Sequence, residues 1–184
     1  MGIRERLIVL PRTVEELQIV SDLYRIVGLP GCAGSADCVH IFWDNCPANL
    51  QSRCKGKEKF PSVVFQVVAS HTKKILSVSG VQYGTANDKT ISRSDSALWR
   101  IRKEGDILKE STFQYYKEDG SVAEEKDGYF YIVDGGYNIW MELIAPLFKH
   151  EPDSSIALSG ANRLSQFTRM SSVCLGYLRD DSRS

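Results

Sequence analysis

Hydrophobic and polar positions alternate in blocks along the chain, and the first block predicts a helix. Residues 11–16 have the pattern of a helix start, with Thr13 as the N-cap and Glu16 as its capping-box partner. The residues that then recur on one apolar face are Leu17, Val20, Leu23 and Tyr24. The Gly-Leu-Pro-Gly sequence of residues 28–31 ends this helix.

Runs of β-branched and aromatic residues predict strands after this helix. The predicted strands are residues 36–43, 62–69, 75–81 and 129–133. The first three would form an antiparallel meander, because a polar turn at residues 70–74 joins the second to the third. The fourth is apolar enough to be buried on both faces, and the glycines after it permit a tight turn.

The remaining segments complete a mixed α/β pattern. Ser94 or Asp95 is placed to cap a helix that carries Ala97, Leu98 and Ile101. The other expectations are a loop at residues 44–59, a solvated connection at 118–127, a short helix at 138–148, a loop at 152–159 and a last helix at 161–178. This order favours a mixed sheet, flanked by helices, in which the first strand is central.

Two aspartates stand beside the apolar strands. Asp37 lies at the start of the first strand, and Asp134 lies at the end of the fourth. A carboxylate next to an apolar run is costly to bury unless a metal ion or a positive partner compensates for its charge. If the first and fourth strands are neighbours, the two aspartates form a carboxylate pair that suits a divalent ion. The alternative is that each is a turn or cap residue.

Composition and charge narrow the class of protein. The chain has 184 residues, 42% of them hydrophobic and 25% charged, with a formal net charge of zero, which indicates one globular domain without a global positive field. No apolar run reaches the roughly 18 residues that span a bilayer, so we expect no membrane partner and an intracellular protein, nuclear or cytoplasmic. The five cysteines lack the spacing of a zinc ribbon.

Two further features are candidates for contact with nucleic acid. The basic residues of the first loop are Arg53, Lys55, Lys57 and Lys59, which suit phosphate contacts, with a solvated loop as the alternative. His40 is three residues beyond Asp37, so a regular strand points the two side chains to opposite faces. Its alternative interpretation is a strand residue with satisfied hydrogen bonds.

Four segments in a fixed order carry a family resemblance. They are residues 28–40 (GLPGCAGSADCVH), 56–61 (GKEKFP), 87–91 (NDKTI) and 133–137 (VDGGY). Together they resemble the catalytic domain of PIF/Harbinger transposases and their domesticated nuclease relatives, from about residue 11 to the end of the chain. The resemblance implies an RNase H-like fold and an Asp-Asp-Glu (DDE) triad that binds two Mg²⁺ or Mn²⁺ ions and acts on DNA.

The resemblance assigns roles to individual residues. Asp37 matches the first acid, and Asp134, in the Asp-x-Gly-Tyr motif, matches the second; both would be catalytic and metal-binding. The position of the third acid, a glutamate in the family, holds Ser172. A neutral hydroxyl is a weak ligand, so this departure weakens a second metal site more than the first. Asp88 is a further candidate ligand, with an Asx turn as its alternative.

The expected organisation is an N-terminal helix at residues 1–30 leading into a DDE endonuclease-like domain at residues 31–184, shortened at its C-terminus. No separate DNA-reading domain is expected, so a partner protein would supply that function, as the family resemblance implies. Because the third acid is replaced, two functions stay open: a metal-dependent endonuclease that acts, or formerly acted, on DNA, and an inactive module that binds DNA or protein. An unrelated small α/β enzyme is a third class, for which we find no Gly-rich phosphate loop or Ser/His/Asp arrangement.

Overall fold

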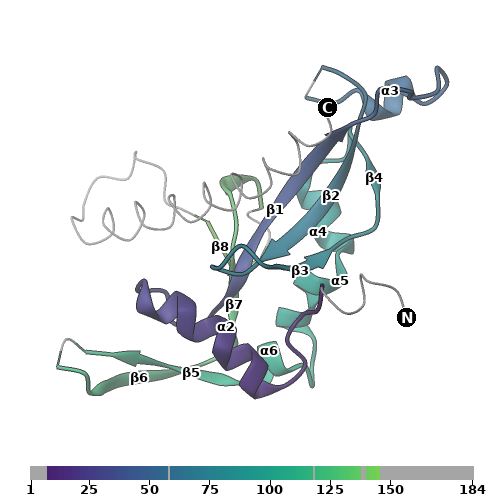
Figure 1. Cartoon of the computed structure of the whole chain (residues 1–184). Coiled ribbons are helices and arrows are strands. Elements are labelled where there is room, and N and C mark those ends of the chain that lie inside the picture. The colour runs from purple at the N-terminus through teal and green to yellow at the C-terminus, as the bar shows by residue number, and fades with distance from the viewer. Residues whose placement is uncertain (1–7, 58, 118, 138–139, 146–184) are drawn as a thin grey trace.

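A mixed β-sheet with helices packed against it forms the body of the protein (Figure 1). The structure is a computed structural model that describes residues 8–57, 59–117, 119–137 and 140–145. The main path of the sheet runs β3-β2-β1-β7-β8, with β4 paired to β2, so β1 is central as the sequence predicts. This mixed α/β architecture is compatible with an RNase H-like fold.

The antiparallel meander expected from the sequence forms one half of the sheet. Strands β1 (Cys32–Phe42) and β2 (Ser62–Ala69) pair along eight positions, from Ser35 opposite Ala69 to Phe42 opposite Ser62. Strand β3 (Ile75–Val78) follows through the polar turn and pairs antiparallel to β2. The short strand β4 (Gln82–Tyr83) also pairs with β2.

The other half of the sheet is parallel. Strand β7 (Phe130–Ile132) pairs parallel to β1, and β8 (Leu143–Ile144) pairs parallel to β7. Tyr131 and Ile132 are fully buried, as expected for a strand covered on both faces. The short helix predicted at residues 138–148 is wrong where the structure describes it, because a two-residue strand occupies Leu143–Ile144. The backbone of residues 143–144 is extended because it pairs in parallel with β7.

Helices cover the sheet and close the core. Helix α2 (Val14–Ile26) begins at the predicted N-cap, where Thr13 Oγ1 accepts a hydrogen bond from the Glu16 amide at 3.3 Å. Its Leu17 packs in the main core with residues of β1, β2 and β7. Three short helical segments complete that core: α5 (Ser96–Trp99), η1 (Arg100–Arg102) and α6 (Ile107–Glu110). The preceding helix α4 (Asp88–Ser94) buries Ile91.

One of the caps of these short helices is the one that the sequence indicates, and the others are additions. Asp95 caps α5, where its carboxylate accepts a hydrogen bond from the Leu98 amide at 2.9 Å. Asn87 caps α4 and accepts from the Thr90 amide at 2.8 Å. The segment before residue 90 was not expected to be helical, so α4 is an addition to the sequence interpretation. The first loop contains one helical turn, α3 (Gln51–Cys54).

A hairpin projects from the body where the sequence favours only a solvated connection. Strands β5 (Thr112–Tyr116) and β6 (Val122–Asp127) pair with each other and with no other described strand (Figure 1). The expectation of a plain connection at residues 118–127 is therefore wrong for β6, although every residue of β6 is exposed. The predicted helix at residues 161–178 and Ser172 lie outside the described residues. No helix among those described is long and apolar enough to cross a membrane.

Candidate functional site

Asp37 and Asp134 lie on neighbouring parallel strands, at corresponding positions. The last paired residues of β1 and β7 are Ser35 and Ile132. Two residues further along each chain stand Asp37, still within β1, and Asp134, just after β7. Because the strands run in the same direction, this register brings both aspartates to one end of the parallel pair. The sequence prediction that they lie on neighbouring strands is confirmed.

Asp134 opens the turn that follows β7. Its Oδ1 accepts a hydrogen bond from the Gly136 amide at 2.8 Å, and its carbonyl oxygen accepts from the Tyr137 amide at 3.2 Å. The turn continues as the short 3-10 helix η2 (Gly135–Tyr137). Asp134 is itself exposed, so its second carboxylate oxygen is available to a ligand even though the first holds the turn. A turn role and a ligand role are therefore compatible at this position.

Asp88 lies beside Asp134. A Cβ atom built on Gly136 would lie 3.0 Å from Asp134 Oδ1 and 3.1 Å from Asp88 Oδ2. Two atoms this close to one point are no more than about 6 Å apart, the sum of the two distances. Asn87, not Asp88, caps α4, and the Asp88 carboxylate faces Lys57 Nζ at 3.9 Å. Both carboxylates thus lie against the face of Gly136 where a side chain would stand.

The electrostatics of Asp37 involve all three acids. The pKa of Asp37 is raised to about 6, first by burial and then by the charges of Asp134 and Asp88. The Cys38 amide, which donates to Asp37 Oδ1 at 2.8 Å, and the Lys57 ammonium act in the opposite direction. A half-buried carboxyl near two like charges is poorly compensated, and a bound cation would relieve this.

The basic loop lies against the acidic site. Its residues Arg53, Lys55, Lys57 and Lys59 are all exposed. Thr85 anchors the loop, because its amide and its hydroxyl donate to the Arg53 carbonyl at 3.2 and 2.7 Å. Lys57 forms the ion pair with Asp88, and the Arg53 guanidinium stacks 4.1 Å from the centre of the Tyr83 ring. The structure thus brings positive charge next to the carboxylates.

The basic loop comes close to the backbone that follows β4 because two glycines, Gly56 and Gly84, lie against each other. A Cβ on Gly56 would lie 2.2 Å from the Gly84 carbonyl oxygen, and one on Gly84 would lie 2.3 Å from the Cys54 carbonyl oxygen. Only residues without a Cβ fit this contact. Sequence reasoning gave no role to Gly84.

His40 is not presented to solvent with the basic loop. Its side chain is 6% exposed, and its Nδ1 lies 3.3 Å from the hydroxyl of Ser62 on β2. Asp37 and His40 are an odd number of residues apart on a continuous strand, so their side chains lie on opposite faces. The geometry favours the alternative of a strand residue for His40, whose Nδ1 lies against Ser62, and separates it from the acids.

Sequence reasoning missed a buried polar group under the acids. Gln66 on β2 is 1% exposed, and its Nε2 donates to the Asp37 carbonyl at 3.1 Å. Its Oε1 accepts from the Tyr137 hydroxyl at 3.0 Å and from the Cys38 thiol at 3.5 Å. Burial raises the pKa values of Tyr137 and Cys38, so both are neutral donors at neutral pH. The available signal was one glutamine inside an otherwise apolar strand.

The donor set suits a hard divalent cation. Carboxylate oxygens are the ligands that Mg²⁺ and Mn²⁺ prefer, and Asp88 and Asp134 supply them beside Gly136, with Asp37 near enough to be affected by their charges. In the part of the chain that the structure describes, no three His, Cys, Asp or Glu residues stand close enough together to hold a metal ion at once. The described residues thus offer a carboxylate pair with a third acid nearby.

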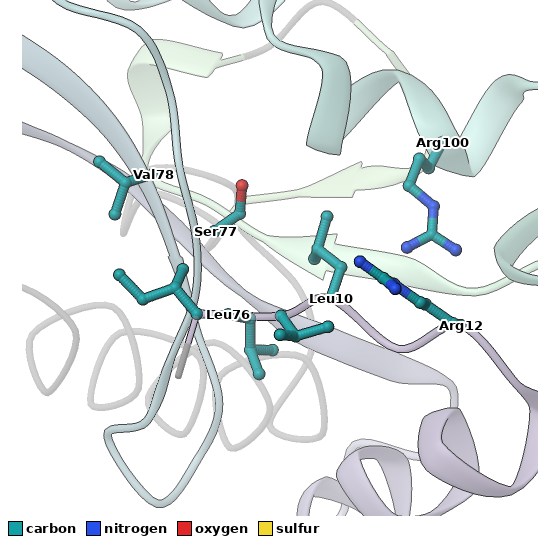
Figure 2. Close-up of a pocket in the computed structure, with 8 residues that line it drawn as sticks. Leu10, Arg12, Leu76, Ser77, Val78 and Arg100 are labelled. Atoms are coloured by element: carbon teal, nitrogen blue, oxygen red, sulfur yellow. The ribbon is translucent and has the colours of Figure 1, made fainter. Parts of the chain in front are cut away.

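A pocket lies away from the acids, beside the edge strand β3. It has a volume of about 360 Å³ and is lined by the N-terminal segment, by Leu76, Ser77 and Val78, and by Arg100. Figure 2 shows the Arg12 and Arg100 side chains approaching the same side of it. Arg100 is already engaged, because its Nε donates to Asp106 Oδ2 at 2.7 Å. None of the predicted site residues lines this pocket.

Fold and site together define a mixed α/β domain with carboxylates gathered at the end of two parallel strands. The family model of plant transposon proteins matches residues 8–157, which is most of the chain, and the chain belongs to this family. Its origin is therefore transposase-like. No curated protein and no solved structure matches the chain.

Proposed function

We propose that the chain carries a PIF/Harbinger-type DDE endonuclease-like domain in which Asp37 and Asp134 hold a divalent metal ion, Mg²⁺ or Mn²⁺. Asp88 stands beside the pair as an additional or outer ligand. When bound, such an ion activates water and stabilises the leaving oxygen during cleavage of a phosphodiester bond. Residues 31–184 would form this domain, with the helix of residues 1–30 leading into it.

One observation carries the proposal. Three acids from separate parts of the chain, on β1, α4 and the turn after β7, lie close enough to raise the pKa of Asp37 together with its burial. Gathering three carboxylates does not stabilise a fold, because their mutual repulsion lowers the free energy of unfolding. A cation that enters the group reverses that cost. The four ordered motifs of the family resemblance contain all three acids.

DNA is the substrate class that the surroundings support. The basic loop carries exposed cations, and one of them, Lys57, pairs with Asp88 at 3.9 Å. Cations of this loop would contact DNA phosphates and bring the DNA backbone toward the metal ion. The formal net charge is zero, so the loop is a local site rather than part of a general positive surface. A separate DNA-binding protein would select the target, and DNA as substrate favours the nucleus.

A second candidate function rests on Ser172. The family resemblance places a glutamate at this position, and a serine hydroxyl is a poor ligand for a hard divalent ion. The second candidate is therefore a module that retains DNA or protein binding but does not cut. Both candidate functions include the carboxylate pair, and they differ only in whether the protein cleaves DNA.

Metal titration tests the shared part of the proposal. Calorimetry with Mn²⁺ is carried out on the wild type, Asp37→Asn and Asp134→Asn. Asparagine keeps the Oδ1 acceptor that each aspartate uses for its backbone hydrogen bond and removes only the charge. We expect each substitution to weaken Mn²⁺ binding by about tenfold or more.

Asp22→Asn is the matched control, because Asp22 pairs with Arg25 on the surface of α2 and should not affect Mn²⁺ binding. Absence of Mn²⁺ binding by the wild type would falsify the metal proposal. A nicking assay on supercoiled DNA then separates the two candidates. Cleavage by the wild type supports the endonuclease, whereas cleavage only by Ser172→Glu supports the inactive module and its lost acid.

A further inference from the structure

Gln66 links the two parts of the candidate metal site. Its side chain is almost fully buried, and it bridges the backbone of β1 at Asp37 to the Tyr137 hydroxyl in the turn after β7. Asp134 begins that same turn, and its Oδ1 accepts from Gly136. One side chain therefore connects the main chain of the first acid to the turn of the second.

The orientation of this amide follows from its partners. The Asp37 carbonyl only accepts hydrogen bonds, so the NH₂ group of Gln66 must face it. The amide oxygen then faces the two donors, the Tyr137 hydroxyl and the Cys38 thiol. A buried amide with donors and acceptors matched in this way has one favourable arrangement, which makes the group rigid.

We propose that Gln66 and Tyr137 are positioning residues that hold Asp37 and Asp134 at the spacing a divalent cation requires. This inference rests on the proposed metal-binding function. Neither side chain touches the metal position; both act through the backbone that carries the carboxylates. Tyr137 is itself part of the turn after β7, because its amide donates a hydrogen bond to the Asp134 carbonyl at 3.2 Å.

The link matters because ligand geometry tolerates little error. A productive site is held within about 0.5 Å by residues whose own rotamers are fixed. Without a metal ion, the like charges of the acids repel one another and favour a wider spacing. Burial of Gln66 and of Tyr137, which is 0% exposed, opposes that movement. The affinity of the site for a cation then depends on two neutral residues.

A hydroxyl deletion tests the proposal. Tyr137→Phe removes the hydrogen bond to Gln66, and Tyr129→Phe is the matched control, because Tyr129 is also buried and its hydroxyl donates to the Thr112 carbonyl at 3.3 Å. We expect Tyr137→Phe to raise the Kd for Mn²⁺ about tenfold and Tyr129→Phe to leave it unchanged. Urea unfolding should show similar losses of stability for both, which separates positioning from general destabilisation.

A second variant and a metal-free measurement keep the test decisive. Gln66→Met conserves volume and removes all three side-chain hydrogen bonds of Gln66, so it replaces Tyr137→Phe if that variant does not fold. Hydrogen exchange of the Gly136 amide is measured without metal, and the expected result is faster exchange in either variant but not in Tyr129→Phe. If Gly136 exchange is unchanged, the positioning inference is overturned, whatever the Mn²⁺ affinity. If the wild type binds no Mn²⁺, the proposed function fails and the exchange experiment still decides whether Gln66 and Tyr137 hold the turn.

Discussion

Asp37 is a residue whose charge costs the protein stability. Its pKa is raised to about 6 by burial first, with Asp134 and Asp88 adding to the effect. In the unfolded chain the same group ionises near its ordinary pKa of 3.8. The folded protein therefore holds a proton on Asp37 more tightly than the unfolded chain does. This sign is opposite to that of a carboxylate that stabilises a fold through a salt bridge.

The pH dependence of stability follows from that sign. From about pH 4 to pH 6 the folded state binds more protons at Asp37, so the free energy of unfolding falls as the pH rises. The loss is complete above about pH 6. Asp37→Asn removes the penalty, so in EDTA at pH 7.5 we expect it to raise the free energy of unfolding by roughly 1–3 kcal/mol. Urea titration of both proteins measures this difference.

Near pH 4 the two proteins should be equally stable, because Asp37 is then neutral in the folded state. Asp22→Asn on the exposed face of α2 serves as the comparison and should give no gain at either pH. A loss of stability in Asp37→Asn at pH 7.5 would show that the carboxylate is compensated within the protein alone.

At the residue level, sequence reasoning found the charged members of the site better than the neutral ones. Asp37 and Asp134 stood out because carboxylates beside apolar strands are unusual, and the structure brings them together. Gln66 passed unnoticed because its importance depends on which residue faces it across β1 and on the turn that carries Tyr137. Such partners come from pairing distant in sequence, and a local pattern does not specify them.

Elements were predictable where local pattern and burial agree. The second strand, at residues 62–69, was placed at both ends as the structure has it, because its apolar run ends at polar turns. The β5–β6 hairpin was missed because β6 is exposed along its whole length and has no apolar face. Strand β8 is only two residues long and forms by parallel pairing to β7. So short a strand has no hydrophobic periodicity from which the sequence could predict it.

The turn element η2 offers a test through its open glycine. A methyl group at Gly136 would stand 3.0 Å from Asp134 Oδ1 and 3.1 Å from Asp88 Oδ2, in the gap between the carboxylates. We expect Gly136→Ala to separate them and weaken Mn²⁺ binding by about tenfold, as other disturbances of ligand orientation do. Calorimetry measures the affinity, and circular dichroism confirms the fold.

Gly80→Ala is the matched control for that substitution, since a Cβ there meets nothing within 4 Å. Alanine at such an open position stabilises by reducing the entropy of the unfolded chain, by up to about 1 kcal/mol. Mn²⁺ affinity should stay at the wild-type level in this control. Equal affinities in Gly136→Ala and the wild type would mean that the gap above Gly136 is not where the ion lies.

At the scale of the whole molecule, the arrangement of charge matters more than its total. The formal net charge is zero, yet the basic loop gathers several exposed cations, and one of them, Lys57, pairs with Asp88. A protein with no overall field binds DNA only through such a local group, and the number of phosphate contacts then sets its salt dependence.

Removing two of these cations should change the salt dependence of DNA binding by a countable amount. In Lys55→Gln/Lys59→Gln, fluorescence anisotropy with duplex DNA should give a plot of log K against log salt whose slope is less steep by about 2, close to one unit for each lost phosphate contact. Lys57 is left intact, because it also pairs with Asp88. The control Lys103→Gln/Lys117→Gln removes two exposed lysines outside the loop and should keep the wild-type slope. If both double variants give the same slope, the loop lysines contribute no more than lysines elsewhere on the protein. The DNA would then bind at another surface.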